Sequence, residues 1–370
     1  MGKLFLMLSL AGLLFSCTTT TSPSETGSSY PEAVIFTDSD IPDTNSLIGE
    51  RLPFPELFEP LTIVQQDGFI YLVNSDRAKN RISAYTSEGK WLRDFLSRGR
   101  GPGEVLGGRY LYFSALNNEL VYTDFKQRKV LLYDTDSLRN SLNQIVNSPD
   151  LAAITIRPQH EIRLGDTPCW RSFPSRNEVF SLVLASDDAP LIVTNDKTGQ
   201  VVRSFGAYPE LAEPVGVQYL SQIFQCNAVV DSAVSRMAIL YQSTDLIDIY
   251  DLKTGKRLHR RHGPSLFYPK FRCEQKGNAY PAFSINGETR DAYFVCVERG
   301  GLIWASYSGN AVSDKVQKIP YIYAFDWDGN PVMKLRLDQR ILSFDVDPEH
   351  RQIYVLSYED GLSYVYRYAY

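Results

Sequence analysis

The chain repeats one local pattern five times, and this repeat limits its fold more than any other feature. Each copy has a strand-like run ending near an aromatic or apolar residue, then a tight polar turn, then a second strand-like run. The copies are residues 84–90, 132–137, 193–200, 249–256 and 324–330. A glycine at the end of the turn supplies the positive φ that such hairpins need. Ser137 takes this place in the second copy, which is therefore the weakest.

A second hairpin signal precedes several of these turns, at residues 66–71, 117–122 and 299–304. Each unit is thus predicted to be a meander with two hairpins in sequence. The turn positions 89, 137, 199, 255 and 329 lie 48, 62, 56 and 74 residues apart. Four-stranded repeats of about 40–50 residues are typical of propeller blades, and the longer intervals indicate loop insertions. A solenoid is the alternative, although its repeats are usually shorter and more regular.

The last unit supplies three strands, predicted at residues 341–346, 352–358 and 362–368. A fourth strand is missing, and residues 33–36 form an apolar run without a partner. We expect this N-terminal strand to complete the last blade, because that pairing closes the ring and removes an open edge. The predicted fold is all-β, a six-bladed β-propeller, with one short helix at residues 136–146.

The N-terminal residues predict export and lipid attachment. Lys3 precedes an apolar run over residues 4–15, which is too short to span a hydrocarbon core of about 30 Å but has the proportions of a secretory signal. Residues 14–17 resemble a bacterial lipobox ending in Cys17, with Phe15 in place of the usual small residue. An ordinary signal peptide with a coincidental cysteine is the alternative.

These features divide the chain into three parts. We expect a lipoprotein signal peptide over residues 1–16, a flexible tether rich in Thr and Ser over 17–30, and the propeller over 31–370. Acylation of Cys17 would attach the protein to a membrane. The formal net charge of −5 gives no general attraction to nucleic acid, so no nucleic-acid partner is predicted.

Four further cysteines bear on the redox state of the protein: Cys169, Cys226, Cys273 and Cys296. An oxidising compartment allows two disulfides, but spacing does not give their connectivity. Buried free thiols are an equal alternative.

Two segments carry a family resemblance. Residues 196–209, together with residues 98–104, resemble the TolB-like six-bladed propeller lipoproteins of Bacteroidetes, and residues 120–133 resemble an NHL-type repeat. The resemblance implies the propeller fold and a location in the bacterial cell envelope, and it implies no catalytic residues. Residues 18–24 lack the acidic cluster that exports many Bacteroidetes lipoproteins to the surface. We therefore expect an outer-membrane lipoprotein that faces the periplasm.

Signatures of catalysis are scarce in this sequence. It contains no G-x-S-x-G, H-E-x-x-H or phosphate-binding glycine loop, and neither a catalytic residue, a cofactor nor a metal ligand is predicted. We therefore favour a non-enzymatic module that binds a protein or a glycan. A metal-dependent hydrolase, lactonase or lyase using the central channel is the rival interpretation.

A basic binding face is the most specific site hypothesis. Loops that follow outermost strands gather on one face of a propeller, and we expect these loops to present Arg98, Arg100, Tyr208, Arg260 and Arg261. Such a face would recognise an anionic glycan or an acidic protein, because arginine and aromatic side chains are common interface anchors. Solvated loops without a ligand are the alternative.

The most distinctive of these loops contains three glycines within residues 99–104. Its backbone N–H groups could form a concave nest for an anion. The simpler alternative is that the glycines only make the sharp turn between two blades.

Overall fold

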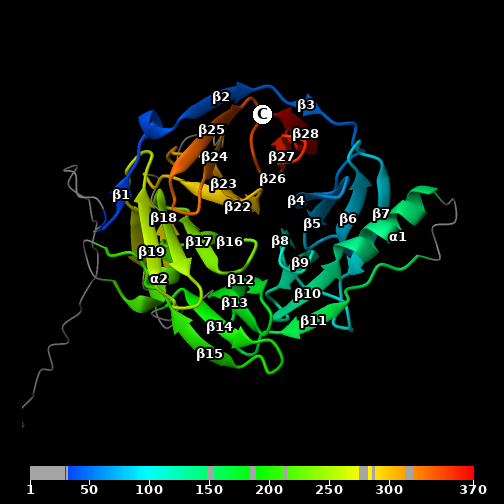
Figure 1. Cartoon of the computed structure of the whole chain (residues 1–370), viewed down its shortest axis with the longest axis horizontal. Coiled ribbons are helices and arrows are strands. Elements are labelled where there is room, and N and C mark those ends of the chain that lie inside the picture. Colours follow the sequence, from blue (N-terminus) through cyan, green and yellow to red (C-terminus); the bar gives the residue numbers. More distant parts are fainter. Residues whose placement is uncertain are drawn as a thin grey trace, which may run out of the picture.

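The protein, described here by a computed structural model, is a ring of six blades around a central channel (Figure 1). The structure describes residue 30 and residues 32–147, 154–183, 189–211, 215–274, 282–285, 288–312 and 320–370, with only the backbone given for residues 218, 272–274 and 282–285. The predicted signal peptide and Cys17 lie outside the described residues, as does the predicted tether except for Tyr30. The predicted six-bladed propeller is confirmed.

Each blade is an antiparallel meander that begins with the strand nearest the channel. Blade one is β4 (Pro60–Gln66), β5 (Phe69–Asn74), β6 (Asn80–Thr86) and β7 (Trp91–Ser97). Blade two is β8 (Tyr110–Ser114), β9 (Glu119–Asp124), β10 (Lys129–Asp134) and β11 (His160–Arg163). Blade three is β12 (Cys169–Pro174), β13 (Glu178–Val183), β14 (Leu191–Asn195) and β15 (Val201–Phe205).

The second half of the ring follows the same order. Blade four is β16 (Cys226–Val230), β17 (Arg236–Tyr241), β18 (Leu246–Asp251) and β19 (Arg257–His262). Blade five is β22 (Tyr293–Arg299), β23 (Leu302–Tyr307), β24 (Tyr321–Phe325) and β25 (Pro331–Leu337). Blade six is β26 (Ser343–Asp347), β27 (Gln352–Glu359), β28 (Leu362–Ala369) and β3 (Glu50–Arg51).

The core lies between blades, which explains why the middle strands are apolar on both faces. Every residue of β5 and of β9 is buried. Side chains of these strands meet in one hydrophobic cluster, in which Tyr71 and Val73 of blade one join Leu120 and Tyr122 of blade two. Burial of apolar surface between neighbouring sheets is therefore what stabilises the ring.

An N-terminal strand closes the ring, but it is not the one predicted. β3 pairs with β28 in antiparallel register and completes blade six. The predicted closing segment contains β1 (Val34–Ile35), which instead pairs in parallel with β19 of blade four. The reason is burial, because Phe36 and Ile41 pack into the cluster between blades four and five.

Between β1 and β3 the chain runs along the outside of the ring (Figure 1). It passes a single 3-10 turn (Asp38–Asp40) and then forms β2 (Asp43–Leu47), which pairs in parallel with β25 of blade five. Residues 32–51 thus form a strap that touches blades four, five and six in turn. We call this segment the N-terminal strap.

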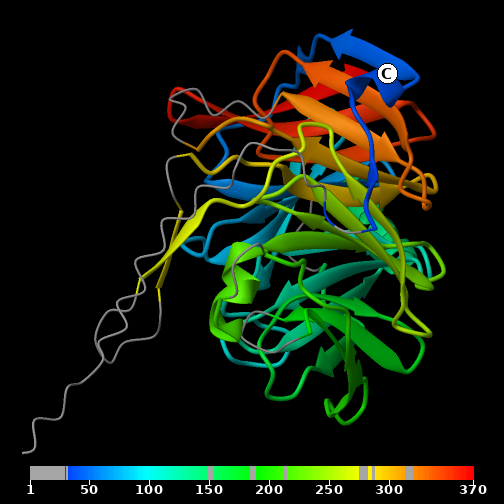
Figure 2. The ribbon, with the colours of Figure 1, turned by 90° about the vertical axis from the view of Figure 1, so that its left-hand side faces the viewer.

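Insertions account for the unequal repeat intervals. The predicted helix is confirmed as α1 (Thr135–Asn147), which follows β10 and buries Leu138, Leu142 and Ile145. A second helix, α2 (Val217–Ile223), lies between blades three and four. A hairpin of β20 (Phe271–Glu274) and β21 (Ala282–Ile285) lies between blades four and five. Figure 2 shows α2 and this hairpin projecting from the same face of the ring.

Three of the cysteines in the propeller are free thiols, namely Cys169, Cys226 and Cys296. The side chain of Cys273 lies outside the described part. Between the two alternatives, disulfides and free thiols, these three cysteines are free thiols.

Candidate functional site

The inner strands of all six blades line a cavity at one end of the central channel, with a volume of about 300 Å³. Each blade contributes side chains to it, for example Thr62, Tyr110, Arg171, Asn227, Val295 and Ser343. These residues lie near the beginnings of the inner strands, beside the loops that join one blade to the next. We call this end the channel mouth, and the surface around it the interblade-loop face.

Irregular strand pairing shapes the channel mouth. The register shifts between Pro60 and Thr62 in β4, between Cys169 and Arg171 in β12, and between Tyr293 and Cys296 in β22. Such shifts re-aim side chains that would otherwise alternate between the two faces of a sheet. Trp170 and Arg171 are consecutive, yet both line the cavity.

Arg171 is the most unusual residue of this cavity. The residue lies in β12 and is only 5% exposed. The guanidinium carbon lies 5.2 Å from the ring centre of Tyr112, 5.3 Å from that of Phe173 and 5.6 Å from that of Tyr110. The cation is therefore held among aromatic rings, which attract it through their negative faces.

A comparison with the other buried arginines shows what Arg171 lacks. Among the residues described, Arg81, Arg171, Arg260 and Arg299 are buried. Arg81 pairs with Asp76 at 3.0 Å, Arg260 with Asp248 at 2.6 Å, and Arg299 with Asp345 at 2.5 Å. Within the described chain, no carboxylate pairs with Arg171, and its Nε has no hydrogen-bond acceptor.

The groups in direct contact with Arg171 are uncharged, whereas Asp231, Glu298 and Asp345 line a small second cavity that Arg171 also reaches. Its Nη1 lies 3.9 Å from the Sγ of Cys296, and burial raises the pKa of this thiol to about 11. Burial also raises the pKa of Tyr110 and of Tyr112 well above the ordinary value. At neutral pH these groups are protonated, so they do not compensate the charge of the guanidinium.

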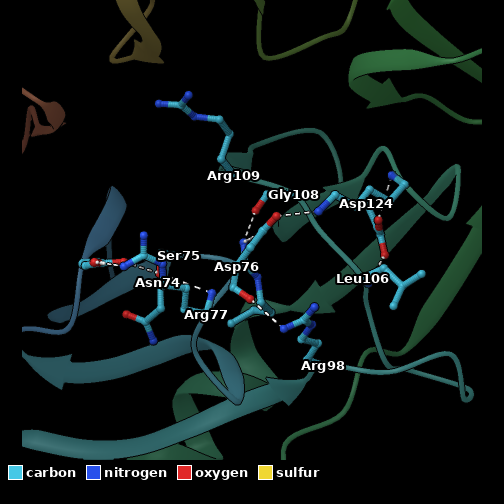
Figure 3. Close-up of polar contacts among 12 residues, drawn as sticks. Asn74, Ser75, Asp76, Arg77, Arg98, Leu106, Gly108, Arg109 and Asp124 are labelled. Atoms are coloured by element: carbon cyan, nitrogen blue, oxygen red, sulfur yellow. Dashed lines mark hydrogen bonds and ion pairs between the residues drawn. The ribbon is translucent and has the colours of Figure 1, made fainter.

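Two more arginines lie at the rim of the cavity. Arg109 is exposed, and Figure 3 shows its side chain extending away from the ion pairs around Asp76. Arg340, in the loop before β26, has a buried Nε that finds no acceptor among the described residues. One carboxylate, Asp291, also lines the cavity, and burial raises its pKa to about 6.

The opposite end of the channel is closed by a paired network. Arg299 donates to both oxygens of Asp345 and to the backbone oxygen of Gln65. The cavity here measures only about 30 Å³, roughly the space of a single water molecule. Space for a ligand is therefore concentrated at the channel mouth.

In the glycine loop of residues 99–104, which could form an anion nest, the Glu104 carboxylate itself occupies the anion position. Glu104 accepts a hydrogen bond from the backbone N–H of Gly101 at 2.8 Å. A side chain at Gly99 would collide with the same carboxylate. Gly99 and Gly101 thus allow Glu104 to fold back over the loop, which leaves little room for an external anion.

Arg98 and Arg100 lie on the interblade-loop face, and both are exposed. Arg98 donates a hydrogen bond to the backbone oxygen of Asp76 at 3.0 Å, as Figure 3 shows. The Asp76 carboxylate in turn binds Arg81 and Lys126, so much of the positive charge at this place is neutralised.

Arg260 and Arg261 do not lie in a loop, which corrects the prediction. Both belong to β19, where Arg260 is opposite Asp248 of β18. Arg260 is buried and holds Asp248 through two hydrogen bonds of 2.6 and 2.7 Å. Arg261 donates to the backbone oxygen of Asp328 and to the side chain of Asn330. These arginines join strands and blades, and Arg260 is not available to a partner.

Tyr208 is also less accessible than predicted. It lies in the loop after β15, where its half-buried ring stacks on Phe224 with the ring centres 6.2 Å apart. The ring belongs to the cluster between blades three and four. The five predicted residues therefore do not form one surface.

Metal-binding groups are not found in the described ranges. No group of three or more His, Cys, Asp or Glu side chains is placed there to hold an ion. None of the helices in these ranges is long and apolar enough to cross a membrane.

With this geometry established, comparison with known proteins identifies the family. A family described as "TolB-like 6-blade propeller-like" matches residues 54–349. The chain belongs to this family. No curated protein matches the sequence at a significant level.

Solved structures of low sequence identity show the same fold. A member of the DUF4221 family from Bacteroides vulgatus has a TM-score of 0.52 and 10% identity, with 87% of this chain and 96% of that chain covered. A putative exported protein from Bacteroides fragilis has a TM-score of 0.50 and 10% identity, with 90% and 99% covered. These similarities support the fold and no more.

Sequence reasoning missed all three arginines of the channel mouth. Arg109 directly precedes β8, Arg171 lies within β12, and Arg340 precedes β26. The sequence did contain a signal for these arginines. A charged residue within or just before the inner strand of a propeller blade lies beside the channel. The prediction instead followed clusters of basic residues along the sequence.

Proposed function

We propose that this TolB-like propeller is the binding module of an envelope lipoprotein, anchored through Cys17 and without enzymatic activity. The channel-mouth cavity carries the proposal. Small ligands and chain ends bind in concave sites with a few well-placed polar groups, and all six inner strands converge on this cavity. The partner is a glycan or a protein segment that inserts into the channel mouth.

A cavity-blocking variant tests the binding role. Gln225 lines the cavity, whereas Glu349 is exposed in the turn after β26, outside the cavity lining. Gln225→Trp should abolish stabilisation of the full chain by a binding oligosaccharide or peptide from a panel of neutral and acidic probes. Glu349→Trp adds the same ring elsewhere and should leave it intact. Equal effects of the two variants, or no binding by any probe, would contradict the proposal.

Lipid attachment is tested separately in cells. Cys17→Ala removes the thiol that would carry the acyl chains, so we expect the variant to appear in the soluble fraction or as an unprocessed precursor. Ser16→Ala keeps a small residue at the cleavage site and should fractionate like the wild type. If Cys17→Ala still sediments with membranes as the wild type does, the anchor is not at this residue. Protease treatment of intact cells distinguishes a periplasmic from a surface position.

A further inference from the structure

We propose that the channel mouth recognises an acidic sugar, a uronic acid, whose carboxylate pairs with Arg171. This inference rests on the proposed binding role and adds the chemical class of the ligand. It starts from the one buried arginine of the described residues that has no carboxylate partner.

The charge of Arg171 calls for an anion. A buried cation without a counter-charge is costly, and proteins normally pair it. The other three buried arginines of the described chain follow this rule, each with a carboxylate within 3.0 Å. The side chain of Arg171 lines the cavity, and its buried Nε–H has no acceptor among the residues that the structure describes. A carboxylate bound in the cavity beside this guanidinium would supply the missing counter-charge.

The remaining lining fits a hydroxylated ring. Gln225 and Gln242 line the cavity, and the side chain of each ends in a carboxamide. Amides can donate to and accept from sugar hydroxyls. Trp170 and Phe294 add aromatic side chains to the lining of the same cavity. The volume of about 300 Å³ is at the small end for ligand sites, so it suits one sugar unit rather than a folded partner.

The rim favours entry of a negative group. Arg109 and Arg340 line the same cavity, and Asp291 is the only carboxylate that the described residues contribute to its lining. Positive groups at the mouth of a cleft raise the local concentration of an anion. A free uronic acid and the terminal unit of an acidic oligosaccharide share this chemistry, and chain length separates these two sources experimentally.

The test is calorimetric titration of the full chain with galacturonate, with trigalacturonate and with neutral galactose. We expect both acidic probes to bind and galactose to bind at least about 30-fold more weakly. Arg171→Met should lower the affinity for galacturonate by a similar factor. Arg171→Lys keeps the charge but loses the planar fork, and it should retain part of the affinity. Arg100→Ser, on the same face but outside the cavity, is the matched control and should bind like the wild type.

The outcomes separate this inference from the proposed function. If probes bind in a way that Gln225→Trp abolishes but Arg171→Met does not change, the binding role stands and acid recognition is wrong. If acetate or inorganic phosphate binds through Arg171 as tightly as galacturonate, the sugar part is overturned. Tighter binding of trigalacturonate than of the monosaccharide would identify a glycan end as the ligand, and equal binding would identify the free acid.

Discussion

Arg171 and Arg299 are both buried beside the channel, and the same substitution should affect them in opposite directions. Arg299→Met leaves the carboxylate of Asp345 buried without a counter-charge, which should lower the free energy of unfolding by about 3–5 kcal/mol. Arg171→Met removes a charge that has no carboxylate within the described chain, and it should raise that free energy by about 1 kcal/mol. Parallel urea unfolding curves measure both effects. A loss in Arg171→Met as large as that in Arg299→Met would show that the surrounding rings hold Arg171 as part of the core.

Asp291 should make stability depend on pH. Burial raises its pKa from 3.8 to about 6, so between these values the folded protein retains a proton that the unfolded chain releases. This stabilising contribution is complete below about pH 4 and is lost as the pH rises through 6. We therefore expect Asp291→Asn to gain stability relative to the wild type between pH 4 and pH 7. The melting temperatures of the two proteins, measured across this pH range, test this prediction. A difference in melting temperature that does not change with pH would contradict it.

The closing strand β3 depends on a close contact at its start. A side chain at Gly49 would meet the ring of Tyr368 in β28 at 2.5 Å. Gly49→Leu should therefore displace β3 from blade six and lower the melting temperature by several degrees. Ile48 is its neighbour but is 86% exposed, so Ile48→Ala should have little effect. Similar melting temperatures for both variants would mean that β3 contributes little to closure.

The blades could be predicted because their signals are local. A turn glycine, the polar residues before it and the flanking apolar runs lie within about ten residues of each other. The pairing of β1 could not be predicted in this way, because it depends on where Phe36 and Ile41 find a buried place between two blades. The basic sequence of β19 favours a loop for a related reason. Its buried Arg260 is tolerated only because Asp248 lies opposite on β18.

The candidate site was beyond prediction because it exists only in the closed ring. Arg109, Arg171 and Arg340 come from blades two and three and from the loop before blade six, and they share one cavity through the arrangement of all six inner strands. The sequence gives neither the register of these strands nor the shifts that re-aim Trp170 and Arg171. The family and the propeller were accessible from the sequence, whereas the position of the pocket was not.

The N-terminal strap covers outer strand edges in one half of the ring and leaves outer edges in the other half open to other molecules. β1 and β2 lie outside blades four and five, and α1 packs against β7 of blade one. Within the described chain, β11 and β15 have no further strand beside them. Charged side chains protect an open sheet edge from pairing, and β11 carries Glu161 and Arg163, whereas β15 begins with exposed Val201 and Val202. An extended peptide from a neighbouring molecule would therefore find both unpaired backbone groups and apolar side chains at β15, the outer strand of blade three, which the strap does not cover.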